Sequence, residues 1–135
     1  MKRYVLDASA LMTFFEDRPG AQKVEDLLAK AAETNRPLLM SVINWGEVYY
    51  SIWRARGQAA AEEKVRQIAQ LPIELVEVDA ATTLLAARLK AESGLPYVDA
   101  FAAALSQQRK ATSVTADKDF QLVQKYVNVL WTNTD

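Results

Sequence analysis

The residues of this chain that could do chemistry are mainly carboxylates, because its 135 residues include no histidine and no cysteine. This absence excludes Ser-His-Asp and Cys-His nucleophiles, acid–base catalysis by histidine, and nearly every zinc, iron or copper site. Hydrolytic chemistry would depend on carboxylates, lysine, tyrosine or hydroxyl groups. Carboxylate oxygens favour hard cations, so Mg²⁺ or Mn²⁺ is the cofactor to expect at such a site.

Asp99 is the most unusual of these acids. It lies in the stretch YVDAFAAAL, in which every other residue is aromatic, aliphatic or alanine. A helix that is apolar on all sides is buried, and an ionised Asp there needs a compensating charge, a metal ion or hydrogen bonds. The structural alternative is a first-turn acid, because Pro96 indicates a helix start and an acid there interacts favourably with the helix dipole.

Asp7 and Glu47 each have a functional and a structural interpretation. Asp7 ends the apolar segment RYVLD, so it could either face a ligand or cap the helix that follows. Glu47 lies in INWGEVYY, where an unpaired buried carboxylate would be costly. Its alternative is a place on the exposed side of a helix, shared with Asn44 and Ser51.

Asp117 and Asp119 follow the apolar segment TSVT in the stretch SVTADKDF. A helix that begins at an acidic cap is the simple alternative. In a parallel sheet, however, the carboxyl ends of the strands share one edge, where open α/β sheets bind ligands. Because acids that converge there repel one another, divalent cations are the usual remedy. The acids expected to converge are Asp7, Glu47, Asp99 and Asp117.

The elements that must position these acids alternate along the chain. Apolar or alternating segments predict strands at residues 3–7, 37–41, 73–78, 112–115 and 127–132. Helical spacing predicts one helix from residue 8 that ends by Pro19, and others at 21–35, 42–57, 58–71, 80–93, 97–110 and 119–126. Strands that alternate with helices predict an α/β three-layer sandwich with a mostly parallel sheet of four or five strands. Residues 1–135 are expected to form a single domain.

Four stretches of the chain carry a family resemblance. YVLDASAL, SVINWGEV, LPYVDAFAAALS and SVTADKDF resemble the four motifs of the PIN domain, and most closely those of the VapC-type toxins of bacterial and archaeal toxin–antitoxin systems. The resemblance covers essentially the whole chain. One departure is Asn44, where many relatives carry a Thr. The residues at the motif positions are Asp7 and Ser9, Glu47, Asp99, and Thr115, Asp117 and Asp119.

The resemblance implies a metal-dependent endoribonuclease that is held inactive by a co-expressed antitoxin. One or two Mg²⁺ (or Mn²⁺) ions bound by Asp7, Asp99 and Asp117 would activate a water molecule, with Glu47 binding through water or orienting and deprotonating the nucleophile. Supporting roles are implied for three further residues: Ser9, Thr115 and Asp119. Asp119 would either support the metal site or cap the next helix.

The expected partners are an RNA substrate, a cognate antitoxin protein and a second copy of the chain in a homodimer. Alternatives are a PIN-type RNA-processing nuclease without an antitoxin, and a non-enzymatic PIN-like binding module. A receiver domain is less consistent with the sequence, because LDAS has one acid where paired acids are needed. A haloacid-type phosphatase would need Asp in place of Ser9.

Composition adds three expectations. No apolar run approaches the ~20 residues of a membrane span, and without cysteine a cytoplasmic location is the simplest interpretation. The formal net charge of −1 becomes +3 when the four converging acids are set aside, which permits RNA binding. Large apolar residues, more than so short a chain obviously needs, could form a groove for an antitoxin helix. They are Met12, Phe14, Phe15, Trp45, Tyr49, Ile52 and Trp53.

Overall fold

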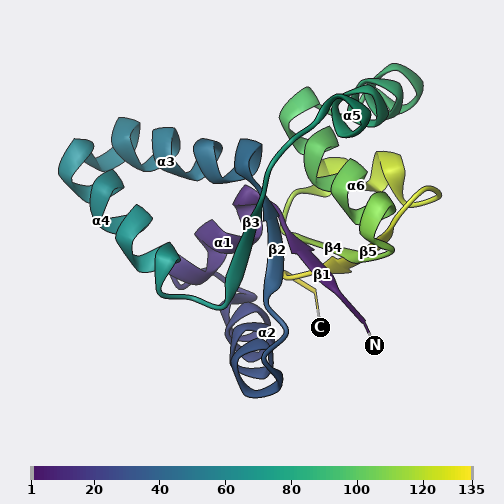
Figure 1. Cartoon of the computed structure of the whole chain (residues 1–135). Helices are drawn as coiled ribbons and strands as arrows, with labels where there is room; N and C mark the ends of the chain where they lie inside the picture. Colours follow the sequence, from purple (N-terminus) through teal and green to yellow (C-terminus); the bar gives the residue numbers. More distant parts are fainter. Residues whose placement is uncertain (1, 135) are drawn as a thin grey trace.

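The five expected strands form one sheet in which all neighbouring strands are parallel. The computed structural model describes residues 2–134. In chain order the strands are β1 (Tyr4–Leu6), β2 (Leu38–Ser41), β3 (Ile73–Val76), β4 (Thr112–Thr115) and β5 (Asn128–Trp131). Their order across the sheet is β3-β2-β1-β4-β5, so β1 is central and β3 and β5 are edges (Figure 1). The prediction of a mostly parallel sheet is confirmed, and the number of strands is five.

Six α-helices and one 3₁₀ helix connect the described strands. They are α1 (Ala8–Phe15), α2 (Ala21–Thr34), α3 (Val42–Arg56), α4 (Gln58–Ala69), α5 (Ala80–Ser93), α6 (Tyr97–Arg109) and the 3₁₀ helix η1 (Lys118–Val123). The helix expected at 119–126 is therefore wrong in type and extent, because the chain makes one short 3₁₀ segment and turns into β5. Over residues 2–134, none of the helices combines the length and apolar character needed to cross a membrane.

The sheet separates two hydrophobic cores. Helices α1 and α2 and the α3–α4 hairpin contribute to one core, whereas α5, α6 and η1 contribute to the other (Figure 1). Successive side chains of a strand point to opposite faces, and β1 and β2 follow this rule. Val5 and Leu39 pack with α5 and α6, whereas Leu6 and Met40 pack with α1 and α2. A sheet covered on both faces by helices is the expected three-layer sandwich.

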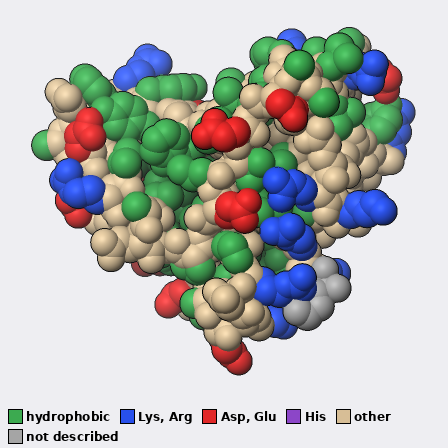
Figure 2. Space-filling view, viewed as in Figure 1, with side chains coloured by type: hydrophobic (Ala, Val, Ile, Leu, Met, Phe, Trp, Pro, Cys, Tyr) green, Lys and Arg blue, Asp and Glu red, His purple; other side chains and the backbone are tan. Residues whose placement is uncertain are grey.

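Helices α3 and α4 form a hairpin that extends away from the sheet (Figure 1, left). Gly57 joins them with a φ of +94°, which residues with a side chain rarely adopt. The Tyr49 hydroxyl donates a 2.5 Å hydrogen bond to Glu62, and Arg56 donates one of 2.9 Å to Glu16 at the end of α1. Hydrophobic side chains fill much of the concave region between this hairpin and the rest of the molecule (Figure 2).

The carboxyl ends of the three inner strands position the candidate site. Asp7 directly follows β1, Ser41 ends β2 and caps α3, and Thr115 ends β4. Strands β1 and β4 are paired in register, with Leu6 opposite Val114, so the residues that follow them emerge side by side. Helix α6 also begins near this edge of the sheet. The Asn44 side chain of α3 donates a hydrogen bond to the Val98 carbonyl in the first turn of α6.

Candidate active site

Asp7 lies at the end of β1 and is almost completely buried. It caps α1 by accepting a 2.8 Å hydrogen bond at Oδ1 from the Ala10 backbone N–H. Ser9 Oγ donates to the same oxygen at 2.8 Å, and Thr115 Oγ1 donates to Oδ2 at 2.5 Å. The capping role considered from the sequence is therefore real. Ser9 Oγ also lies 3.0 Å from Oδ2, so both oxygens of the Asp7 carboxylate are held by hydrogen bonds.

The hydroxyl groups of Ser9 and Thr115 connect the segment after β1 to the segment after β4. Their oxygens lie 3.2 Å apart. Ser9 Oγ accepts a 2.9 Å hydrogen bond from the Ala116 backbone N–H, and Thr115 Oγ1 accepts one of 2.9 Å from the Asp117 N–H. These bonds fix the backbone from which Asp117 extends, and they hold Asp7 in one orientation.

Asp99, Asp117 and Asp119 each place one carboxylate oxygen within 4.8 Å of the other two. Asp99 lies in the first turn of α6 and is 9% exposed. Asp117 accepts a 2.9 Å hydrogen bond from the Asp119 backbone N–H and so caps η1. Asp119 is therefore not the cap of that helix. The Asp119 carboxylate instead lies with those of Asp99 and Asp117. Of the two roles considered from the sequence, helix cap or support of the metal site, the first is therefore wrong.

Glu47 comes from α3 and is half-buried, and its Oε1 is buried without a hydrogen-bond partner. The structural alternative, in which Glu47 shares an exposed side of the helix with Asn44, is wrong because Asn44 is completely buried. Its Nδ2 donates a 3.1 Å hydrogen bond to the Val98 carbonyl, next to Asp99. Asn44 thus joins α3 to the start of α6. The one sign of this contact in the sequence is a polar residue within an apolar stretch, and nothing there identifies its partner.

The electrostatics of the site reflect burial first and mutual repulsion second. Burial raises the pKa of Asp99 to about 8, and the charges of Asp117, Asp7 and Glu47 add to the rise. Burial likewise raises the pKa of Asp7 to about 6, although the bonds from Thr115, Ala10 and Ser9 oppose it.

The pKa of Glu47 is also raised by burial, partly offset by the Asn44 side chain and increased by the charge of Asp117. Within the described part of the chain, the ion pairs of arginine lie elsewhere, at Glu16 and Glu63. The clustered acids therefore have no cationic side chain paired with them. Carboxylates that are close together, buried or half-buried, and without a paired cation are suited to binding a divalent metal ion.

Among solved structures, several toxin–antitoxin proteins share this fold at low sequence identity. The DNA-bound VapBC of Salmonella typhimurium is 16% identical with a TM-score of 0.74, covering 98% of this chain and 99% of that one. VapBC2 of Rickettsia felis, bound to a promoter DNA fragment, is 19% identical with a TM-score of 0.72 over 94% and 96% of the two chains. VapC20 of Mycobacterium tuberculosis, described as a sarcin-ricin loop cleaving toxin, is 19% identical with a TM-score of 0.64 over 87% and 92%.

No curated protein sequence matches this chain significantly. A family model does: the model of the PIN domain matches residues 4–126, which include all four motifs that carry the candidate site. This match extends over nine-tenths of the sequence and agrees with the parallel five-stranded fold. The chain belongs to the PIN domain family.

Proposed function

We propose that this chain is a metal-dependent endoribonuclease and the toxin of a toxin–antitoxin pair. The observation that carries the proposal is the group of three carboxylates whose oxygens lie within 4.8 Å, beside the buried Asp7, at the carboxyl edge of a PIN-domain sheet. So many close acids are costly to maintain for structural reasons alone. The cluster is understandable if its carboxylates bind a cation that takes part in a reaction.

The donor set fits Mg²⁺ or Mn²⁺. Every candidate ligand is a carboxylate oxygen, and the chain has no histidine or cysteine to favour softer metals. Asp99, Asp117 and Asp119 would hold the ion, with the carboxylate of Asp7 beside them. A bound divalent ion would lower the pKa of a water ligand and stabilise negative charge on a phosphodiester.

The residues of the chain then have separable tasks. Ser9 and Thr115 hold the Asp7 carboxylate and the backbone before Asp117 in place, as their hydrogen bonds indicate. Glu47 is half-buried, has a raised pKa and is close enough to Asp117 to be affected by its charge, so its carboxylate is suited to accept a proton from an attacking water molecule.

RNA is the proposed substrate, since the similar fold of VapC20 belongs to a protein described as cleaving the sarcin-ricin loop. We also propose that the protein acts in the cytoplasm as a homodimer.

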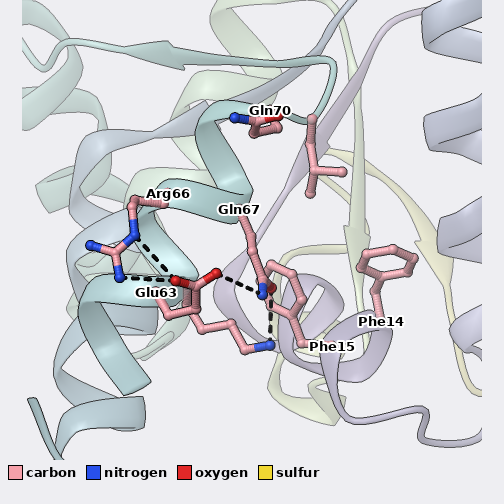
Figure 3. Close-up of a pocket in the computed structure, with 8 residues that line it drawn as sticks. Phe14, Phe15, Glu63, Arg66, Gln67 and Gln70 are labelled. Carbon is pink, nitrogen blue, oxygen red and sulfur yellow. Dashed lines mark hydrogen bonds and ion pairs between the residues drawn. The ribbon is translucent and has the colours of Figure 1, made fainter. Parts of the chain in front are cut away.

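The antitoxin is proposed as a protein partner because several structures of similar fold are VapBC or other toxin–antitoxin complexes. A hollow of about 710 Å³ between the end of α1 and helix α4 offers it a surface (Figure 3). Phe14 and Phe15 line the hollow, and Lys64 lies 4.6 Å from the centre of the Phe15 ring. Of the apolar set expected from the sequence, Ile52 is buried in the core instead and cannot contact a partner.

Cleavage of total bacterial RNA by the purified protein tests the nuclease proposal. We expect cleavage with Mg²⁺ or Mn²⁺, none with excess EDTA, and none by Asp99→Asn. Asp26→Asn is the matched control, because Asp26 is an exposed acid on α2, distant from the site in the fold. Full cleavage by metal-free protein, or by Asp99→Asn, would contradict the proposal.

Co-expression with the product of a neighbouring short open reading frame tests the toxin proposal. We expect a complex that blocks cleavage, and we expect Phe15→Glu to weaken the complex while free enzyme activity is kept. An RNA-processing nuclease without an antitoxin would show activity but no such inhibition.

A further inference from the structure

Helix α3 carries an exposed side that leads away from Glu47 and is not used by the proposed chemistry. At 3.6 residues per turn, Tyr50 and Arg54 follow Glu47 on roughly the same side of the helix, with Arg54 offset by only about 20°. At a rise of 1.5 Å per residue they lie about 4.5 and about 10.5 Å further along its axis. In Figure 1, α3 runs outward from the sheet edge where the acids gather.

Both side chains are available to a ligand. Tyr50 is 48% exposed and Arg54 is exposed. Over residues 2–134, neither side chain takes part in a hydrogen bond, an ion pair or an aromatic contact of the structure. Two nearby residues of α3 do have such contacts. The Trp53 ring packs edge-on against the Tyr49 ring, with 5.7 Å between the ring centres, and Arg56 donates a hydrogen bond to Glu16. Figure 2 shows basic side chains above α3, on the upper side of the molecule.

We infer that Tyr50 and Arg54 form a binding track for the single-stranded RNA next to the cleaved bond, with Tyr50 stacking on a base and Arg54 contacting a phosphate. An aromatic ring beside a cation is the combination that holds unpaired nucleotides, because every base has a face to stack and every linkage carries a charge. Glu47 lies at the inner end of the track, so RNA held there passes the acid cluster. The inference rests on the proposed nuclease function and adds how that site holds its substrate.

The negative charge of the acid cluster favours an RNA-binding surface outside it. The ionised carboxylates of the cluster repel RNA phosphates until a metal ion offsets them, and the chain as a whole has a formal charge of −1. Contacts outside the acids would therefore add affinity for RNA that the acids do not provide. Exposed side chains that begin one turn from Glu47 supply such contacts without adding a cation to the metal site.

Binding of a fluorescein-labelled single-stranded RNA of mixed sequence, followed by fluorescence anisotropy over a range of salt concentrations, tests the track. Measurements in the Asp99→Asn background avoid cleavage of the probe. Tyr50→Ala should weaken binding by about 5- to 150-fold, the range expected for one stacked base, and Tyr50→Phe should retain most of the affinity. Arg54→Ala should reduce the slope of log K against log salt by about 0.7, the value for one phosphate contact on a single strand.

Two matched controls separate the track from general surface effects. Leu84→Ala removes an exposed large apolar side chain on α5, and Lys30→Ala removes an exposed cation on α2. Neither should change RNA affinity by more than about twofold. With Asp99 restored, Tyr50→Ala and Arg54→Ala should raise KM for total RNA more than they lower kcat.

The outcomes distinguish the two proposals. If the unsubstituted protein cleaves no RNA with Mg²⁺ or Mn²⁺, the nuclease function is wrong, and the binding data still decide the track. If it cleaves RNA but Tyr50→Ala and Arg54→Ala bind RNA as the parent protein does, the track is wrong and the function stands. Loss of self-association in light scattering, with RNA affinity unchanged, would assign this side of α3 to a second copy of the chain and overturn the inference.

Discussion

Replacement of Asp99 by Asn should stabilise the metal-free protein, which is unusual for a change at a buried residue. Asn is nearly the same size as Asp, so the packing of the first turn of α6 should be kept. The change removes the negative charge that burial and three neighbouring acids disfavour. It also removes a favourable interaction with the helix dipole, worth about 0.3–1 kcal/mol. The sign of the result depends on which contribution is larger.

The pKa of Asp99 sets the magnitude. It rises from 3.8 to about 8, so the folded state keeps a proton that the unfolded state has released. The free energy of unfolding of the metal-free protein therefore falls as pH rises from about 4 to about 8. At 1.36 kcal/mol per unit, the loss reaches at most about 4 kcal/mol at pH 7. Folded Asp99 is mainly protonated at pH 7, so little dipole interaction is lost there, and the gain in Asp99→Asn should be up to about 4 kcal/mol, or about 10–15 °C in Tm.

Thermal unfolding in EDTA between pH 4 and pH 8, followed by circular dichroism, measures this effect. The Tm of Asp99→Asn should exceed that of the parent protein at pH 7 and 8, and the two should converge near pH 4. Asp26→Asn, on the exposed side of α2, should match the parent protein throughout. A Tm for Asp99→Asn that is equal or lower at pH 7 would refute the reasoning and favour a structural first-turn acid.

Three further predictions concern metal binding, the hydroxyl groups and one glycine. Mg²⁺ or Mn²⁺ should raise the Tm of the parent protein in proportion to RT ln(1 + [L]/Kd), and a titration of Asp99→Asn that gives the same rise would contradict the site. Thr115→Val should lower the free energy of unfolding by about 1–3 kcal/mol, because Asp7 loses the 2.5 Å hydrogen bond from the Thr115 hydroxyl. Unfolding in urea measures this loss, and an unchanged midpoint would show that the hydroxyl does not stabilise the fold. Gly20→Ala should destabilise the protein much more than Gly57→Ala, although both have positive φ. A Cβ at residue 20 would lie 2.0 Å from the Thr132 carbonyl oxygen, whereas the space at residue 57 is open. Equal decreases in the free energy of unfolding of the two variants, measured in urea, would disprove the clash.

Much of the fold could be predicted because its signals are local. Each strand is a short apolar run with a turn or helix signal beside it, and the boundaries of α3 and α5 follow from Gly57 and Gly94 directly after them. The order of strands in the sheet has no such local signal. It depends on which apolar faces pack together, as when β4 pairs with β1 across more than a hundred residues. The 3₁₀ form of η1 was missed for a similar reason, since its acidic start and apolar residues suit an α-helix equally well.

The candidate site was predictable in its residue types but not in its contacts. Acids that follow strands or interrupt apolar helices are visible in the sequence, which is why Asp7 and Asp99 could be selected. The burial of Asn44 could not be foreseen, because its partner is the Val98 carbonyl, 54 residues away. The roles of Asp117 and Asp119 depend on one backbone N–H that points to Asp117. Such contacts are set by tertiary structure, and periodicity in the sequence does not encode them.

Asp7 shows why folding and the proposed chemistry are difficult to separate in this site. Its carboxylate caps α1 and accepts the hydroxyl bonds that join β1 to β4, so it stabilises the centre of the sheet. Burial nevertheless raises its pKa to about 6, which means that its ionised form is maintained at a cost. Asp99 lacks this compensation: no hydrogen bond of the described chain reaches its carboxylate except through its acidic neighbours. Loss of activity in an Asp7 variant would therefore combine a folding defect with a metal-binding defect, whereas Asp99→Asn isolates the charge. Replacement of Asp99, whose carboxylate is buried without a neutral hydrogen-bond donor, therefore tests the function more directly than replacement of Asp7.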